Sequence, residues 1–108
     1  MSNALLEGIR VAVNERSYRF TPHAADRMSE RRITVGDIEE ALLSQKAEVI
    51  EDYPNDPRGA SCLILGVTKA SRPLHVQCTY PPNVAVVPAY EPRAEEWTDW
   101  RTRRVSET

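Results

Sequence analysis

The sequence contains few of the residues that build metal sites and phosphate-binding loops. Its 108 residues include two histidines, two cysteines and four glycines, without a paired Cys-x-x-Cys. His75 and Cys78 stand three apart in a segment that we predict to be a strand, so their side chains should point to opposite faces. The sequence has no glycine-rich phosphate loop and no motif for a nucleophilic serine or cysteine. We therefore predict no metal and no cofactor.

The chain also has no apolar run that approaches the roughly 20 residues of a membrane-spanning helix. Residues 1–16 form an amphipathic segment without the basic start and continuous apolar core of a signal peptide. We therefore expect a cytoplasmic protein that does not interact with a membrane. In a reducing compartment Cys62 and Cys78 are most simply buried free thiols, although strand pairing can bring them close enough for a disulfide.

The positive charge that general nucleic-acid binders carry is missing as well. The formal net charge is −2 and the pI is near 5.7. The distribution is uneven, because residues 37–56 contain seven carboxylates and one lysine. The basic residues cluster at Arg27, Arg31 and Arg32, and again at Arg101, Arg103 and Arg104. Each cluster is compatible with a local basic site and with ordinary solvated charge.

Helical periodicity and capping signals occupy the first half of the chain. Apolar residues at helical spacing predict a helix over residues 3–14. Thr21 can cap a second helix with Pro22 in its first turn, and this helix should run to about Arg32. Thr34 and Asp37 have the spacing of a capping box, which predicts the start of a third helix.

From Ala47 onwards the hydrophobic period changes to that of strands. Apolar runs at 47–53, 61–67, 74–80 and 84–90 are separated by turn-forming residues, which favours an antiparallel meander. His75, Gln77 and Thr79 alternate with apolar residues, which is typical of a strand with one wet face. Pro88 cannot donate a hydrogen bond to a ladder, so the last strand should lie at an edge or be bulged there.

Together these patterns predict one α+β domain over residues 1–108. Two or three N-terminal helices, at about 3–45, precede a four- to five-stranded, mainly antiparallel sheet at about 47–90. A short C-terminal helix that contains Trp97 and Trp100, followed by a basic tail, should occupy residues 94–108.

One side of the second helix carries residues with obvious chemistry. Spacings of four place His23, Arg27 and Arg31 along one stripe, with Glu30 beside them. An imidazole can move a proton near neutral pH, and guanidiniums can clamp a phosphate and stabilise the charge that develops on it. His23 would lie in the first helical turn, where the dipole favours the neutral imidazole that a base requires.

Aromatic residues beside arginines form a second candidate cluster. Its members are Tyr90, Trp97, Trp100, Arg101, Arg103 and Arg104. Because aromatic rings stack nucleobases and arginines hold backbone phosphates, the three arginines are candidate nucleic-acid contacts. Both clusters also have a structural interpretation: the tryptophans would anchor a C-terminal helix on the sheet, and the helix arginines would be solvated or paired with Glu48 and Glu51.

These two clusters resemble the family called domain of unknown function 4258, which comprises small bacterial and archaeal domains. The shared pattern is His-Ala, Arg-Met and Glu-Arg-x-Ile, found here at residues 23–24, 27–28 and 30–33. A looser pattern of Tyr-x-Pro, an acidic stretch, Trp and a basic close lies at residues 90–104. The resemblance covers roughly residues 18–104. Two positions depart from it: Arg32 replaces a frequent glycine, which weakens the expectation of a helix stop, and Pro88 replaces a frequent threonine.

The resemblance implies a fold similar to the small ribonuclease toxins of toxin–antitoxin modules, of the RelE and MqsR kind, which cleave mRNA without a metal. It leads to the hypothesis of a metal-independent endoribonuclease-like toxin with an RNA substrate and an antitoxin partner. In this hypothesis His23 is the general base or acid, and Arg27 and Arg31 hold the scissile phosphate. Tyr90 and Arg101 assist. The alternative is a non-catalytic module that binds nucleic acid or protein through the same basic helix face. Neither hypothesis fixes an oligomeric state.

Overall fold

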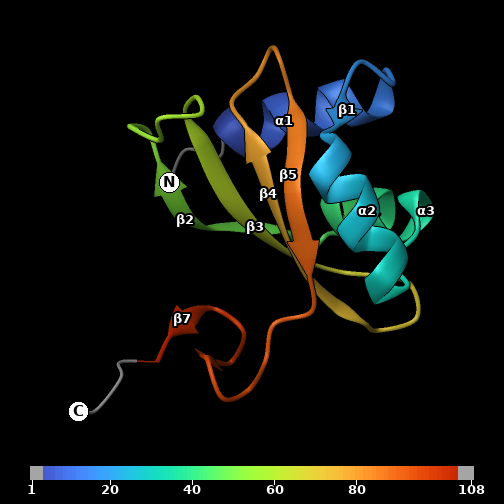
Figure 1. Ribbon diagram of the computed structural model, residues 1–108, viewed down its shortest axis with the longest axis vertical. Helices are drawn as coiled ribbons and strands as arrows, with labels where there is room; N and C mark the ends of the chain where they lie inside the picture. The colour runs from blue at the N-terminus through green and yellow to red at the C-terminus, as the bar shows by residue number, and fades with distance from the viewer. Residues whose placement is uncertain (1–3, 105–108) are drawn as a thin grey trace.

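Helices come first in the chain and strands follow, in a computed structural model that describes residues 4–104 (Figure 1). The helices are α1 (Ala4–Asn14), α2 (Pro22–Arg31) and α3 (Val35–Leu43), with the short strand β1 (Arg19–Phe20) between the first two. The later strands are β2 (Glu48–Tyr53), β3 (Ser61–Val67), β4 (Pro73–Thr79), β5 (Ala85–Tyr90), β6 (Trp97–Thr98) and β7 (Thr102–Arg103). The predicted α+β class, with three helices before the sheet, is confirmed.

Five strands form the main sheet, in the spatial order β1-β5-β4-β3-β2. The strands β2 to β5 pair with their neighbours in sequence and are antiparallel, which confirms the predicted meander. The fifth strand is β1, which pairs in parallel with β5 through Arg19 opposite Ala85 and Phe20 opposite Val86. Since β1 has only two residues, the second half of β5 has no strand partner on that side among residues 4–104.

Both predicted helix starts are present. The Thr21 hydroxyl accepts the Ala24 N–H at 3.1 Å, and Pro22 occupies the first turn of α2. Thr34 and Asp37 form a reciprocal capping box at the start of α3, with both hydrogen bonds at 3.0 Å. These two caps fix where the helices enter the layer that covers the sheet.

The predicted end of α2 at about Arg32 is confirmed, although an arginine stands at the terminating position in place of the frequent glycine. Arg32 adopts the left-handed conformation, with φ 57° and ψ 44°. The Ile33 N–H then donates to the Met28 carbonyl at 2.9 Å, as in a Schellman cap. A glycine would adopt this conformation without cost, whereas a residue with a Cβ is strained by roughly 1–2 kcal/mol.

The main hydrophobic core lies between the helices and one face of the sheet. It includes fully buried residues of β3 and β4, packed against all three helices; the strand residues are Cys62, Ile64, Leu74, Val76 and Cys78. Gly66 marks the closest approach of a helix to the sheet, because a Cβ there would lie 2.9 Å from Ala41 Cα and closer still to the Ala41 carbonyl. The two cysteines are buried free thiols on directly opposite positions, as predicted.

Two irregularities interrupt the strand ladders. Between β4 and β5 the register shifts after Val76, so Gln77 opposes the two residues before Ala89. Pro88 is one of these two, which confirms the predicted bulge. A second shift lies between Val49 and Glu51 on β2, the strand that ends the sheet.

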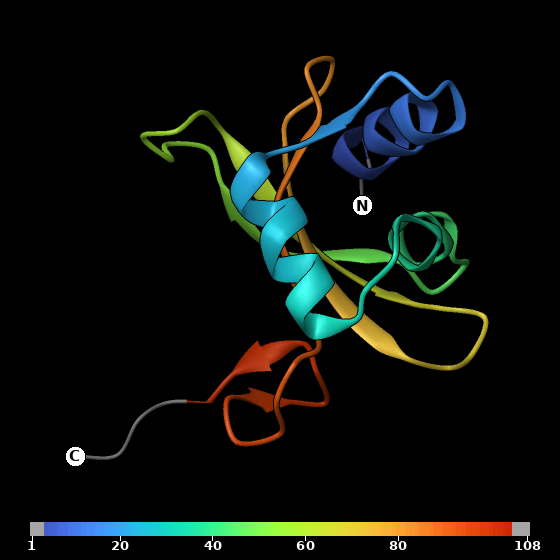
Figure 2. The same ribbon diagram turned by 45° about the vertical axis from the view of Figure 1, so that its right-hand side comes forward.

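The predicted C-terminal helix is wrong. The segment forms a small hairpin of β6 and β7, with Trp97 opposite Arg103, and lies at the far end of the sheet from α1 (Figure 2). Tertiary contacts override the helical spacing of the two tryptophans: Trp97 is buried against the ring of His75, with centroids 4.4 Å apart, while Trp100 stays 41% exposed.

This hairpin also overturns the expectation of a wet face at His75. His75 lies on the opposite face of β4 from Leu74 and Val76, yet it is fully buried. Its neighbours across the sheet are Leu65 on β3 and Tyr90 on β5. These three residues form a row across adjacent strands on the face that the hairpin covers. Within residues 4–104, no helix is long and apolar enough to cross a membrane.

Candidate functional site

The three predicted stripe residues of α2 are all exposed, but they do not share one cleft. Arg27 forms an ion pair with Glu30, with 3.1 Å between Arg27 Nη1 and Glu30 Oε2. His23 makes no hydrogen bond or ion pair to any part of the chain that the structure describes. Arg31 is the member of the stripe that reaches a concave surface.

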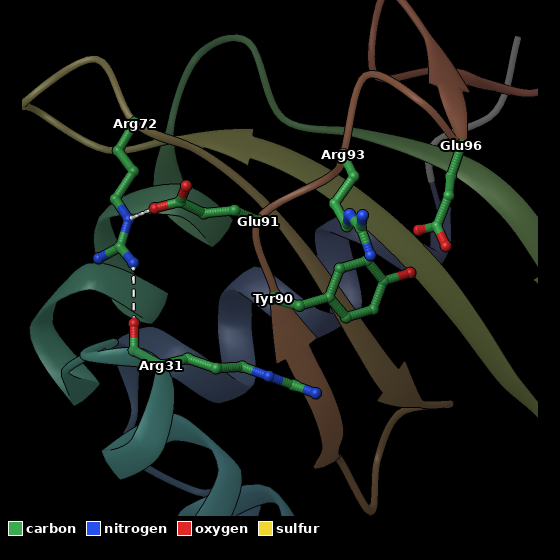
Figure 3. Close-up of a pocket in the computed structure, with 6 residues that line it drawn as sticks. All are labelled: Arg31, Arg72, Tyr90, Glu91, Arg93 and Glu96. Atoms are coloured by element: carbon green, nitrogen blue, oxygen red, sulfur yellow. Dashed lines mark hydrogen bonds and ion pairs between the residues drawn. The ribbon is translucent and has the colours of Figure 1, made fainter.

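Arg31 and Tyr90 meet in a cleft between the end of α2 and the segment that follows β5 (Figure 3). We call it the arginine cleft; its volume is about 520 Å³, and it is lined by Arg31, Arg72, Tyr90, Glu91, Arg93 and Glu96. The guanidinium carbon of Arg31 lies 6.0 Å from the centroid of the Tyr90 ring. Three guanidiniums outnumber two carboxylates, so the cleft favours an anion.

A backbone carbonyl at the open edge of β5 orients Arg31. Its Nη1 donates to the Ala89 carbonyl at 2.9 Å. This carbonyl lies beyond the short pairing of β5 with β1, which ends at Val86. One guanidinium nitrogen is thus held by the sheet edge, which leaves other donors of the fork for a ligand.

Arg72 holds the far wall of the cleft together. Its Nη1 donates to the Arg32 carbonyl at 2.9 Å and its Nη2 to the Arg31 carbonyl at 3.1 Å, so it caps the C-terminus of α2. Its Nε donates to the Glu91 carboxylate, and Asp37 lies 3.5 Å from Nη1. Because these donors are occupied, Arg72 shapes the cleft and offers little to a ligand.

Tyr90 links the cleft to the buried His75. The His75 Nε2 lies 2.6 Å from the Trp100 carbonyl, which can only accept, so this nitrogen carries the proton. The unprotonated Nδ1 then accepts the Tyr90 hydroxyl at 3.4 Å. Burial lowers the pKa of His75 and raises the pKa of Tyr90. At neutral pH the pair is therefore a neutral imidazole and a protonated phenol.

Glu96 and Arg93 complete the cleft on the hairpin side. The guanidinium of Arg93 lies 3.4 Å from the Glu95 carboxylate in an exposed pair, so it is readily released to a ligand. The Glu96 side chain forms no hydrogen bond or ion pair with the described residues, and its charge raises the pKa of Tyr90. A carboxylate, a phenol and two available guanidiniums thus border one space.

The three C-terminal arginines all have intramolecular partners. Arg101 pairs with Glu48, and Arg103 pairs with Glu51 at 3.3 Å while its guanidinium lies 4.6 Å from the Trp97 ring. The Nε of Arg104 donates to the Ala94 carbonyl at 2.6 Å. The acidic strand β2 is thus paired with the C-terminal arginines, not with those of α2.

Metal binding finds no support in the geometry of the described chain. Among residues 4–104, no three His, Cys, Asp or Glu side chains lie close enough together to hold a metal ion. The absence of a structural metal therefore stays a prediction, which elemental analysis would test.

The comparison with known proteins gives one match. The family model described as domain of unknown function (DUF4258) matches residues 20–91, two-thirds of the chain. The chain belongs to this family. No curated protein and no solved structure matches the chain. The matched region includes α2 and Tyr90 but ends before the hairpin, whereas the resemblance noted from the sequence extended to residue 104.

Sequence reasoning missed three residues around Tyr90: His75, Arg93 and Glu96. The positions of Arg93 and Glu96 could have been expected, because they follow Tyr90 closely in the sequence and must therefore lie near it. For His75 the signal was the register of the meander, which places residue 75 beside residue 90. The alternation of the strand was interpreted as solvent exposure, and the hairpin that covers His75 was not foreseen.

Proposed function

We propose that the protein is a metal-independent endoribonuclease of the toxin type, and that the arginine cleft is its active site. One observation carries the proposal: Arg31 and Tyr90, from opposite halves of the chain, converge there with a carboxylate and a second guanidinium. Cleavage of RNA without a metal needs a base for the 2′-hydroxyl, an acid for the leaving 5′-oxygen and cations on the phosphate. The cleft contains a carboxylate that can serve as the base, a phenol that can serve as the acid, and guanidiniums that can bind the phosphate.

The proposed reaction is transfer of the phosphate to the neighbouring 2′-oxygen. Glu96 takes the proton from the 2′-hydroxyl, and the 2′-oxygen attacks the phosphorus as the bond to the 5′-oxygen breaks. Tyr90, whose phenol is protonated at neutral pH, leaves its hydrogen bond to His75 Nδ1 and gives its proton to that 5′-oxygen. Arg31 and Arg93 stabilise the charge on the phosphate. The products are a 2′,3′-cyclic phosphate and a 5′-hydroxyl.

The test is incubation of purified protein with RNA oligonucleotides in a chelator, followed by analysis of the product ends. Glu96→Gln and Tyr90→Phe should each slow cleavage roughly 10²- to 10⁴-fold. Arg31→Ala should lose a charge-assisted contact of about 1.5–3 kcal/mol, with its melting temperature measured beside it because the Ala89 contact is lost as well. RNA that stays intact with folded wild-type protein would contradict the proposal.

Arg27→Ala is the matched control. Arg27 lies one turn before Arg31 on the same helix but does not line the cleft, so its loss should leave cleavage unchanged. The alternative function is a non-catalytic module that binds RNA or protein through the face of α2. The exposed positions of His23 and Arg27 favour it, since both are accessible there. In that case Arg27→Ala and His23→Ala weaken binding as much as Arg31→Ala, and no turnover is measured.

The toxin assignment and the antitoxin partner have a test of their own in cells. Expression of the wild-type chain in a bacterial host should arrest growth, and Tyr90→Phe should relieve the arrest. Growth that is unaffected by the wild-type chain, at a protein level equal to that of the variant, would leave a ribonuclease without a toxin role.

A further inference from the structure

The tip of the β6–β7 hairpin is held in a strained conformation. The Arg101 N–H donates to the Thr98 carbonyl at 3.0 Å and closes a turn whose central residues are Asp99 and Trp100. Both have positive φ, 52° and 64°, the pattern of a type I′ turn. Asn-Gly is the usual sequence there, and a tryptophan at such a position is disfavoured by its Cβ. A bulky aromatic residue that is kept in a strained backbone conformation points to a functional role for its side chain.

Buried contacts hold this tip on the sheet. The His75 Nε2–H donates to the Trp100 carbonyl at 2.6 Å, and Trp97 packs edge-on against the same imidazole. The backbone of Trp100 is thereby fixed to β4, whereas its side chain remains 41% exposed. The ring is therefore presented to solvent from a rigid base, and little freedom would be lost when a flat ligand stacks on it.

The charges around the ring favour a nucleic acid as that ligand. Trp100 borders a second cleft together with Arg101 and Arg104, and Asp99 is the carboxylate of that cleft. Arg101 is more than half exposed in its pair with Glu48, so its guanidinium can turn to a phosphate at little cost. An exposed indole that shares a cleft with two arginines can stack a nucleobase while the arginines hold the adjoining backbone.

We propose that Trp100 is a stacking platform for a nucleobase of single-stranded RNA, set beside the arginine cleft on the same C-terminal segment. This inference rests on the proposed function and adds a subsite to it. His75 is its positioning residue, because it holds the turn that presents the ring. A protein partner that docks on the ring is the competing occupant.

The experiment compares two 2′-O-methyl strands, which bind without being cleaved. Both have about twelve phosphates, within the length that single-stranded binding sites cover, but one carries bases and the other abasic spacers. Trp100→Asn should weaken binding of the base-containing strand roughly 5- to 100-fold and leave the abasic strand unchanged. Asparagine tolerates the left-handed turn, so the hairpin is kept. Trp100→Phe should retain most of the affinity, and Arg31→Ala should weaken both strands.

A second readout needs no variant. Trp97 is 2% exposed, so quenching of tryptophan fluorescence by the base-containing strand reports on Trp100. The stacking platform is overturned if Trp100→Asn binds the base-containing strand normally, or if it loses the same affinity for both strands. In either case the arginine cleft stands, provided that Arg31→Ala still binds both strands weakly. Unquenched fluorescence in a wild-type complex overturns the platform as well. Wild-type protein that binds neither strand overturns the platform and the proposed function together.

Discussion

The two faces of the central sheet are built from different chemistry. The helix-covered face buries only apolar side chains and thiols from β3 and β4, packed against α1, α2 and α3. The hairpin-covered face buries a histidine whose two ring nitrogens both have partners, beside a tyrosine and a tryptophan. Apolar packing has no preferred direction, whereas a directed polar network sets the protonation and orientation of groups at its rim. The comparison shows that one face is held by apolar packing, whereas the other holds the polar groups that border the candidate site.

The largest expected loss of stability comes from a substitution on the helix-covered face of the sheet. Gly66→Ala would place a methyl group against the Ala41 carbonyl, and both partners are backbone that cannot move aside. We expect a loss of about 3 kcal/mol or more, a large share of the stability of a typical domain, measured by chemical denaturation.

The control is Gly36→Ala in the first turn of α3. A Cβ there would meet only the Thr34 hydroxyl oxygen, at an ordinary 3.6 Å. Because alanine is the better helix former, this variant should gain up to about 1 kcal/mol. Equal stability of the two variants would show that α3 does not pack closely against Gly66 of β3.

The next effect concerns the hairpin-covered face. His75→Phe keeps a ring against Trp97 but leaves the Trp100 carbonyl without its donor. We expect a loss of about 1–3 kcal/mol, accompanied by a change in Trp100 fluorescence as the turn loosens. An unchanged spectrum with an unchanged melting temperature would mean that His75 does not hold the hairpin.

The same residue makes stability depend on pH. Burial lowers the pKa of His75 in the folded state below its unfolded value of about 6.5, so the unfolded chain binds more protons in the window between the two. Stability is therefore complete above pH 6.5 and falls as the pH drops through that window. Thermal melts from pH 7.5 to 5 should show a smaller loss for His75→Phe than for wild type.

The smallest effect lies at the corner between α2 and α3. Arg32→Gly should raise the free energy of unfolding by about 0.5–1 kcal/mol, because glycine takes the left-handed conformation freely. The Arg32 carbonyl, which Arg72 binds, is unaffected. Arg32→Ala keeps the Cβ and should gain nothing. A gain for alanine equal to that for glycine would trace the effect to the lost charge instead.

The fold was predictable where the signals are local. Thr21-Pro22 and the Thr34–Asp37 pair start their helices as expected, and the alternating runs of the second half gave the order of the meander. The missing N–H of Pro88 predicted an edge strand or a bulge there, and a bulge is present. The end of α2 at about Arg32 was predicted, whereas the left-handed conformation of Arg32 was not, since nothing in an arginine favours it.

The site was only partly predictable, because its key contacts are distant in sequence. Arg31 and Tyr90 were both chosen as candidates, and the structure brings them together, yet the helix stripe suggested His23 and Arg27 as their companions. Helical spacing identifies residues on one face of α2 but does not show which of them meets β5. The hairpin turn at Trp100 carried no Asn-Gly signal, so its two tryptophans looked helical.

The irregular strand β2 has a consequence for the behaviour of many copies in solution. It ends the sheet that the described residues form, and the outer N–H and C=O groups of such an edge can pair with a strand from another molecule. The register shift between Val49 and Glu51 breaks the regular spacing that such a strand would need. The irregular edge strand β2 therefore disfavours the edge-to-edge pairing of sheets that leads to fibrils.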